Sequence, residues 1–220
     1  MSLLTNATHR VLDFLWPPIC IGCGRVGTQL CRICGNHLTF WDNSRTGLES
    51  LQLSPSLRRV YSAVEYIDDA QKIVKAVKFS GYWTYTTLMA QLIVLQCGHR
   101  LRQEKIDVLV PVPIHPRRRR ERGFNQTEKL AHELGKLLNI PVDTKSLYRA
   151  VYRKKQSQQN QTSRQSLHHD FAVRGTQLIN KNICLVDDVF TTGATLSACT
   201  RALAQTPHKS IIAVVFAKPR

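Results

Sequence analysis

The segment 183–195 constrains the fold more than any other stretch of this chain. Its first four residues are apolar, which is typical of a strand buried on both faces of a parallel sheet. The run stops at two adjacent carboxylates, Asp187 and Asp188, and a Thr/Gly-rich turn follows. Residues 194–204 then have the pattern of a helix. A strand, two acids, a turn and a helix in this order predict one unit of an open α/β sheet.

The two acids and the turn predict a binding site for a phosphorylated sugar. In an open parallel α/β sheet, ligands bind beyond the carboxyl ends of the strands, where Asp187 and Asp188 would project. The turn 190–195 offers backbone N–H groups, hydroxyls and Gly193 at the start of a helix, which is a favourable place for a phosphate. A ligand with cis hydroxyls and a phosphate, such as ribose 5-phosphate, matches both features. The alternative is that the acids only end a strand and cap a helix.

The segment resembles the 5-phosphoribosyl-1-diphosphate (PRPP) binding motif of type I phosphoribosyltransferases. The resemblance implies that Asp187 and Asp188 are the catalytic acids and contact the 2′ and 3′ hydroxyls of the ribose. It also implies an α/β fold, a doubly wound sheet of about five parallel strands with a small variable hood. The residues that it assigns to the 5′-phosphate are Thr191, Thr192, Gly193, Ala194 and Thr195.

Composition allows one α/β domain of ordinary size with a small appendage. The chain has 220 residues, of which 43% are hydrophobic, so it can bury one substantial core. Its formal net charge is +16, and its sequence pI is about 10.0. This excess of positive charge predicts a polyanionic partner, and nucleic acid, an anionic membrane surface and diphosphate substrates all remain open.

No segment of the sequence has the length and apolarity of a membrane span, which needs roughly 18 to 20 residues. The apolar stretch 88–95 is short and contains Gln91. The N-terminus also lacks the charged start, apolar run and cleavage site of a signal peptide, so we expect a cytoplasmic protein. Apolar residues recur at helical spacing over 3–16. That pattern fits either an interfacial helix in peripheral contact with the inner face of the membrane, or a helix packed on its own domain.

Four of the seven cysteines form two Cys-x-x-Cys pairs near the N-terminus. Two such pairs in one short segment are typical of a structural zinc site with four thiolate ligands. Because protein ligands would fill all four coordination positions, the zinc would fold a small module or grip a partner. Two disulfides are the alternative, but the lack of an export signal argues for a reducing compartment. The predicted ligands are Cys20, Cys23, Cys31 and Cys34.

The chain as a whole is predicted to have three regions: a zinc-binding module at 1–45, a linker at 46–58 and a phosphoribosyltransferase-like domain at 59–220. Turn-forming Asn, Gly, Ser and Pro residues without a helical or strand period mark the linker. Within the large domain, periodicity predicts strands at 60–67, 107–113 and 210–217, and helices at 70–78, 85–102 and 125–138.

A second chemical segment lies just after the predicted strand 107–113. It contains five arginines within six residues. Arginine forms paired hydrogen bonds with phosphate oxygens, so this run fits stabilisation of a leaving diphosphate, contact with a nucleic-acid backbone, or simply a solvated basic face. The five residues are Arg117, Arg118, Arg119, Arg120 and Arg122.

The order of the motifs narrows the resemblance. Four motifs follow one another along the chain: the four-cysteine module, Val-Pro-Val-Pro-x-His-Pro, Arg-Glu-Arg-Gly-Phe-Asn-Gln, and Val-Asp-Asp-Val-x-Thr-Thr-Gly-x-Thr. In this order they resemble the ComF/ComFC/GntX family of competence-associated phosphoribosyltransferase-like proteins. The resemblance implies natural transformation or use of DNA as nutrient, with incoming single-stranded DNA handled at the cytoplasmic face of the membrane beside competence-machinery proteins. Between 153 and 171 the chain departs from the regular family pattern, and only Lys155 and Arg164 are carried over there as basic contacts.

Two functions therefore stay open. In the first, the chain is a competence and DNA-uptake protein that keeps the PRPP-binding fold for nucleotide sensing or for single-stranded DNA. In the second, it is an active phosphoribosyltransferase of nucleotide salvage or metabolism. PRPP would then bind with Mg²⁺, diphosphate would leave, and an unidentified acceptor would attack C1′ of the ribose. The sequence specifies no pocket for a particular base.

Overall fold

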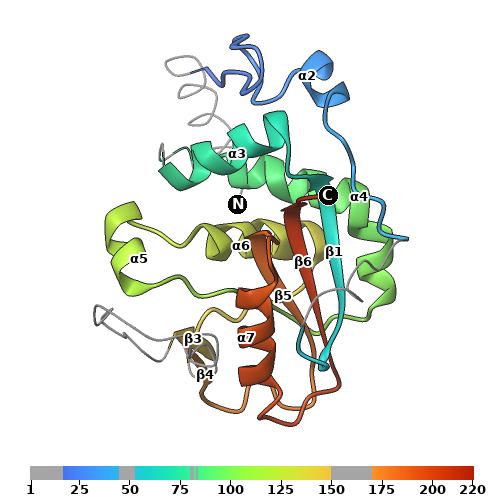
Figure 1. Ribbon diagram of the computed structural model, residues 1–220, viewed down its shortest axis with the longest axis vertical. Helices are drawn as coiled ribbons and strands as arrows, with labels where there is room; N and C mark the ends of the chain where they lie inside the picture. Colours follow the sequence, from blue (N-terminus) through green and yellow to red (C-terminus); the bar gives the residue numbers. More distant parts are fainter. Residues whose placement is uncertain (1–16, 45–52, 80–81, 83, 150–169) are drawn as a thin grey trace, which may run out of the picture.

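The centre of the molecule is a parallel sheet of four strands in the order β1-β6-β5-β2 (Figure 1). All three neighbouring pairs are parallel, which confirms the predicted α/β class. The strands are Leu57–Glu65 (β1), Val108–Pro111 (β2), Asn182–Val189 (β5) and Ser210–Lys218 (β6). The computed structural model describes residues 17–44, 53–79, 82, 84–149 and 170–220.

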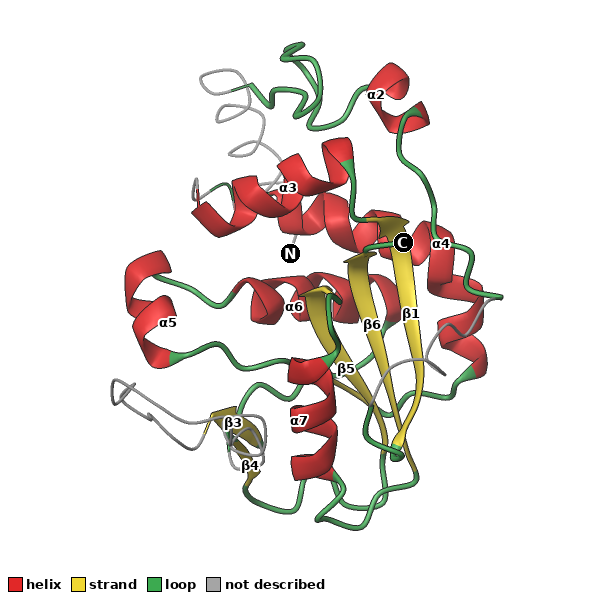
Figure 2. Ribbon diagram, viewed as in Figure 1, coloured by secondary structure: helices red, strands yellow, loops and turns green. Residues whose placement is uncertain are grey.

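Helices cover both faces of this sheet, as Figure 2 shows. Helices α4 (Tyr85–Gln103) and α6 (Gln126–Leu138) pack on one face, and α7 (Ala194–Leu203) packs on the other. Helix α3 (Asp68–Phe79) lies beyond the carboxyl ends of the strands, toward which their arrowheads point in Figure 1. The sheet is therefore doubly wound. Among the described residues, none of these helices is long and apolar enough to cross a bilayer.

Strand β5 shows why the segment before the acids is apolar throughout. Cys184 and Val186 point into the core beneath α4 and α6, whereas Ile183 and Leu185 point into the core beneath α7. Side chains of a strand alternate between the two faces of a sheet, and both faces are covered here, so no position of the run is left for a polar residue. The apolar run ends where the acids begin.

A single bridge occupies the place of a fifth parallel strand. Val142 pairs with Leu109 of β2, where the Leu109 N–H donates to the Pro141 carbonyl and the Asp143 N–H donates to the Leu109 carbonyl, each at 2.9 Å. The pairing stops after this residue because the Asp143 carboxylate accepts hydrogen bonds from the N–H groups of Lys145 and Ser146, which turns the chain. The sheet among the described residues thus has four strands and a stub.

The predicted helices and strands lie where expected, with ends displaced by up to three residues. Within the described part of the large domain, three elements were not predicted: α5 (Pro116–Arg122) and the short antiparallel pair β3 (Leu147–Arg149) and β4 (Phe171–Val173). Helix α5 contains the arginine run. His115 caps it, since its Nδ1 accepts the Arg117 N–H at 3.1 Å, and a left-handed glycine ends it.

The N-terminal module is attached along the free edge of β1. Phe40 forms an antiparallel bridge with Val64, and the Trp41 N–H donates to the Ala63 carbonyl at 3.0 Å. The module also contains the short helix α2 (Arg32–Asn36). Strand β1 begins at Leu57, inside the range predicted as linker, and residues 46–52 of that range lie outside the described residues.

Candidate functional site

A cavity of about 820 Å³ opens at the carboxyl ends of the strands. Its described wall comes from eight elements or their flanking loops: the loops after β1 and β2, the C-terminus of α3, α5, the start of α6, the residue that ends β3, the end of β5 and the start of α7. Asp187, Asp188, Thr191 and Thr195 are all part of this wall. The structure therefore brings both predicted acids and two residues of the predicted turn into one cavity.

Asp188 is a buried carboxylate with partners from two helices. It is 5% exposed. Its Oδ1 lies 2.9 Å from Nζ of Lys78, the last lysine of α3, and its Oδ2 accepts a hydrogen bond from Nε2 of Gln126 at 3.2 Å. A buried carboxylate needs such partners because burial removes its hydration. Asp188 is thus held in one orientation at the cavity wall.

Asp187 has a different environment from its neighbour. Burial, together with the nearby charge of Asp188, raises the pKa of Asp187 to about 8, although the Asp188 N–H donates to its Oδ1 at 2.9 Å. The raised pKa favours the protonated form of Asp187 in the ligand-free protein. A protonated carboxyl group can both donate and accept hydrogen bonds, which suits a sugar hydroxyl.

The 191–195 loop joins β5 to α7 and presents the first backbone N–H groups of that helix. Thr191, Thr192, Ala194 and Thr195 are exposed and surround a small hollow of about 20 Å³. Free N–H groups at a helix N-terminus attract an anion. Gly193 has φ of 75°, and a Cβ built on it would lie 2.4 Å from Cδ2 of Leu53, so only glycine fits this turn without displacement.

The basic residues predicted to contact phosphate lie on α5, at the side of the cavity. Among the described wall residues, α5 supplies Glu121 but none of its arginines. Arg117 pairs with Glu121 at 2.8 Å and Arg119 pairs with Glu128 at 3.5 Å, while Arg120 is exposed. Arg118 and Arg122 also belong to α5, and their side chains lie outside the described part of the chain, as do Lys155 and Arg164.

Sequence reasoning missed three cationic or amide groups at the cavity. Lys78 and Gln126 hold Asp188. Arg149 of β3 lines the wall and pairs with Asp170 at 2.9 Å, and its buried Nε has no hydrogen-bond partner among the described residues. Gln126 could have been found from the sequence, since it is the last residue of the motif Arg-Glu-Arg-Gly-Phe-Asn-Gln. No sequence motif marks Lys78 or Arg149, because they reach the site only through the packing of α3 and of the β3–β4 pair.

The four cysteines of the N-terminal module lie together. Their sulfur atoms are all within 4.8 Å of one another, and those of Cys23 and Cys31 are 3.7 Å apart. Zinc–sulfur bonds of about 2.3 Å in a tetrahedron separate sulfurs by about 3.8 Å, so the cluster has the spacing that zinc requires. The full set is Cys20, Cys23, Cys31 and Cys34.

Hydrogen bonds to sulfur favour thiolates in part of this cluster. The Cys31 N–H donates to the sulfur of Cys20 at 3.3 Å. Burial opposes ionisation of Cys20, but this and other backbone N–H groups outweigh it and lower its pKa to about 6. Burial and the neighbouring thiols raise the pKa of Cys34 to about 12. A divalent cation among the sulfurs would favour ionisation of all four thiols.

Residues 99–220, from the end of α4 to the last residue, match the family model described as phosphoribosyl transferase domain. The chain belongs to this family. The match covers the acid pair, the 191–195 loop, α5 and Arg149, and it leaves out the cysteine module, β1 and α3. The predicted phosphoribosyltransferase fold with a four-cysteine N-terminal module is confirmed.

Relatives with curated names extend over most of the chain. Competence protein F of Haemophilus influenzae is 27% identical over 197 residues, which are 84% of this chain and 83% of that protein. Competence protein ComFC of Bacillus subtilis is 28% identical over 210 residues, 90% and 83% of the two chains. DNA utilization protein YhgH of Escherichia coli K12 is 26% identical over 191 residues, 84% and 82%. These matches confirm the resemblance to the competence-associated family.

One solved structure that is similar to this chain is the purine phosphoribosyltransferase of Pyrococcus horikoshii. It has a TM-score of 0.38 and 21% sequence identity, and the overlap covers 58% of this chain and 71% of that one. UMP synthase of Leishmania donovani has a TM-score of 0.37 and 16% identity over 68% of this chain and 24% of that one. At these values neither structure bears on the substrate of this chain.

Proposed function

We propose that the chain is a DNA-uptake protein that binds PRPP in the cavity at the carboxyl ends of its strands. The observation that carries this proposal is the convergence of the acid pair with the 191–195 loop on one cavity of about 820 Å³. Asp187 and Asp188 bind the 2′ and 3′ hydroxyls of the ribose, and Thr191 to Thr195 bind the 5′-phosphate. The names of the relatives, competence and DNA utilization proteins, support the biological role.

Arg149 is the group best placed to bind the diphosphate of PRPP. It lines the same cavity, and its partly buried guanidinium lies 5.3 Å from the ring centre of Phe171, which fixes its position. Arginine is well suited to phosphate oxygens because it donates in pairs. The carboxylates also offer the oxygen ligands that Mg²⁺ prefers, and a bound Mg²⁺ would neutralise charge on the diphosphate.

Zinc is the proposed ion of the four-cysteine cluster. The sulfur spacing and the N–H hydrogen bonds to sulfur support it. Replacing Cys20 and Cys23 with serine in the full chain would remove two ligands, so zinc measured by mass spectrometry should fall from one ion per chain to near zero. Replacement of the buried Cys184, which lies in the sheet, is the control and should leave the zinc content unchanged.

Single-stranded DNA is the proposed polyanionic partner, and α5 is its proposed contact. The described arginines of α5 face solvent, and their ion pairs with Glu121 and Glu128 are surface pairs, which contribute little and exchange readily for phosphate. The net charge of +16 supports the same partner. We place this activity on the cytoplasmic side, in peripheral contact with the membrane and with other competence proteins.

Calorimetric titration with PRPP and Mg²⁺ tests the sugar-phosphate site. The wild type should bind, and the double variant Asp187→Asn, Asp188→Asn should lose at least a hundredfold in affinity. Glu133→Gln on α6, which removes one carboxylate away from the cavity, is the control and should bind as the wild type does. Equal binding by the acid variant would show that PRPP does not use these acids.

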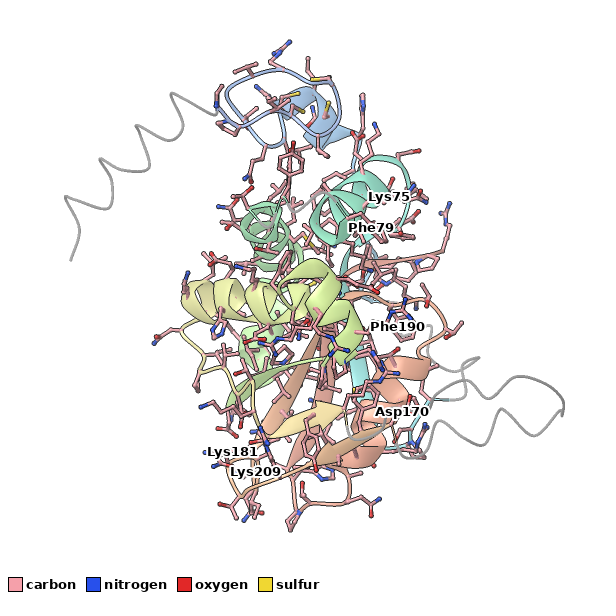
Figure 3. All side chains as sticks on the ribbon, turned by 90° about the vertical axis from the view of Figure 1, so that its left-hand side faces the viewer. Lys75, Phe79, Asp170, Lys181, Phe190 and Lys209 are labelled. Carbon is pink, nitrogen blue, oxygen red and sulfur yellow. The ribbon has the colours of Figure 1, made fainter. Side chains whose placement is uncertain are left out.

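Fluorescence anisotropy with a labelled oligonucleotide tests the DNA contact. Replacing Arg117, Arg119 and Arg120 with glutamine should weaken binding and reduce the salt slope by about two, since each single-strand phosphate contact contributes about 0.7. The control replaces three exposed lysines at the amino ends of the strands, Lys105, Lys181 and Lys209. Figure 3 shows Lys181 and Lys209 at the lower end of the molecule, away from Phe79 at the cavity. Equal losses of DNA affinity in both variants would mean that the positive charge of the protein attracts DNA without a specific contact on α5.

Catalytic transfer of the phosphoribosyl group is the second candidate function. The observation that favours it is an aromatic wall beyond the acid pair, where Tyr66, Phe79 and Phe124 line the cavity and Phe79 is 76% exposed. Such rings offer stacking surfaces to an acceptor base. Release of diphosphate from PRPP in the presence of free bases or of single-stranded DNA would establish turnover, and tight PRPP binding without release would favour the binding function alone.

A further inference from the structure

The ammonium group of Lys218 lies between two aromatic rings from distant parts of the chain. Its Nζ is 4.6 Å from the ring centre of Trp41 and 5.3 Å from that of Phe190. Lys218 ends β6 and is partly buried, and burial lowers its pKa. Partial desolvation strengthens the attraction between a cation and aromatic faces, so this lysine joins the two rings.

The two rings belong to the cysteine module and to the base of the 191–195 loop. Trp41 is fixed by its N–H bond to Ala63 and by the Gln96 amide, which donates to the Trp41 carbonyl at 2.7 Å. Phe190 is 1% exposed and lies directly under Gly193, because a Cβ on that glycine would be 2.9 Å from the ring atom Cζ. The position of the Phe190 ring therefore sets the position of the loop.

A second line of contact runs from the module to the acid pair. Gly22 fits between Cys34 and Asp69, since a Cβ on it would be 2.6 Å from the Cys34 sulfur and 2.7 Å from Oδ2 of Asp69. Asp69 lies in the first turn of α3, and Lys78 in its last turn pairs with Asp188. The module thus contacts the elements that hold both halves of the cavity.

We propose that Lys218 is a positioning residue, which with Trp41 and Phe190 lets the cysteine module hold the 191–195 loop in its anion-binding conformation. The module then acts as a brace, meaning that it restrains the loop at the cavity. This role is separate from any binding of a partner by the module. The identity of the anion rests on the proposed function, whereas the restraint on the loop does not. The two are measured separately.

Amide hydrogen exchange of residues 191–195 in the ligand-free, full-length protein measures the restraint. Lys218→Met keeps the length of the side chain and removes its charge, so the loop amides should exchange about fivefold faster, an effect of the size of one cation–π contact. Trp41→Leu should do the same. The double variant should exchange no faster than either single variant, because each substitution interrupts the same connection between the module and Phe190.

A conservative variant separates positioning from general stability. Lys218→Arg retains a cation between the rings and should restore slow exchange, which a purely structural loss would not allow. Lys209→Met, at the other end of β6, is the matched control and should leave the loop unchanged. Exchange in Lys218→Met equal to that in Lys209→Met, or additive effects of the two single variants, would overturn the proposal.

PRPP titration of the same variants distinguishes this proposal from the proposed function. We expect the wild type to bind PRPP and Lys218→Met to bind it severalfold more weakly. Lys218→Arg should recover the affinity of the wild type. Wild-type protein that binds no PRPP would refute the proposed ligand, and the exchange data would still decide whether Lys218 restrains the loop. Normal PRPP affinity in Lys218→Met would contradict the brace.

Discussion

The end of β5 and helix α5 are both rich in charge, and both are candidates for phosphate contact, but they are built differently. At β5, Asp188 is buried and its partners come from α3 and α6, far away in the sequence. On α5, Arg117 pairs with Glu121 one turn away, and both side chains are more than half exposed. The first arrangement is fixed by the tertiary fold before a ligand arrives, whereas the second is a solvated surface pair. We therefore expect shape-specific recognition at β5 and sequence-independent attraction at α5.

The largest expected contrast concerns the ion pairs. Lys78→Met leaves the buried Asp188 carboxylate without its cation and should lower the free energy of unfolding by about 2 to 4 kcal/mol. Arg117→Met removes a surface pair and should change it by no more than about 0.5 kcal/mol. Urea denaturation of both variants measures the difference. Similar losses in the two would show that the acid pair is no more fixed than the surface of α5.

Two left-handed glycines give the next contrast. Gly193 has φ of 75° and Gly123, at the end of α5, has φ of 76°, but only Gly193 has neighbours within contact distance of a new Cβ. Gly123→Ala should therefore destabilise by about 1 to 2 kcal/mol from the backbone alone. Gly193→Ala adds overpacking of about 1 to 3 kcal/mol and should also weaken PRPP binding. Thermal unfolding and titration would measure both, and equal behaviour of the two variants would remove the distinction.

A further contrast depends on pH. Burial and the charge of Asp188 raise the pKa of Asp187 to about 8 in the folded protein, above its ordinary value of 3.8. The stability that this proton contributes is complete below about pH 4 and is lost as the pH rises through 8. The stability of Asp187→Asn relative to the wild type should accordingly increase between pH 4 and pH 8. Denaturation at pH 5, 7 and 9 measures it, and a difference independent of pH would contradict the raised pKa.

The sequence was most informative where burial is two-sided. The continuous apolar run before Asp187 is typical of a strand covered on both faces, so the fold class and the place of the acids and the turn could be predicted from one segment. The paired cysteines were equally direct, because metal spacing is local in the sequence. Helix α5 was missed as a helix because four consecutive arginines have no apolar period, and the capping by His115 and Pro116 is a weaker signal.

The partners of the site could not be predicted from the sequence for a physical reason. Lys78, Arg149 and Lys218 act through packing between elements that are far apart in the chain, and each is a single basic residue in a chain that has 31 of them. Nothing local distinguishes a lysine that pairs with a buried acid from one that faces solvent. Only the assembled sheet and the attachment of the cysteine module reveal which is which.

The most direct measurement is the backbone NMR spectrum of the full chain during titration with PRPP and Mg²⁺. We predict that the largest shifts fall on the amides of residues 187–195, with the loop N–H groups moving downfield as they donate to phosphate, and that the amides of α5 move little. Shifts concentrated on α5, with residues 187–195 unchanged, would contradict it. In that case the acid pair and its loop would not be the site of the sugar phosphate.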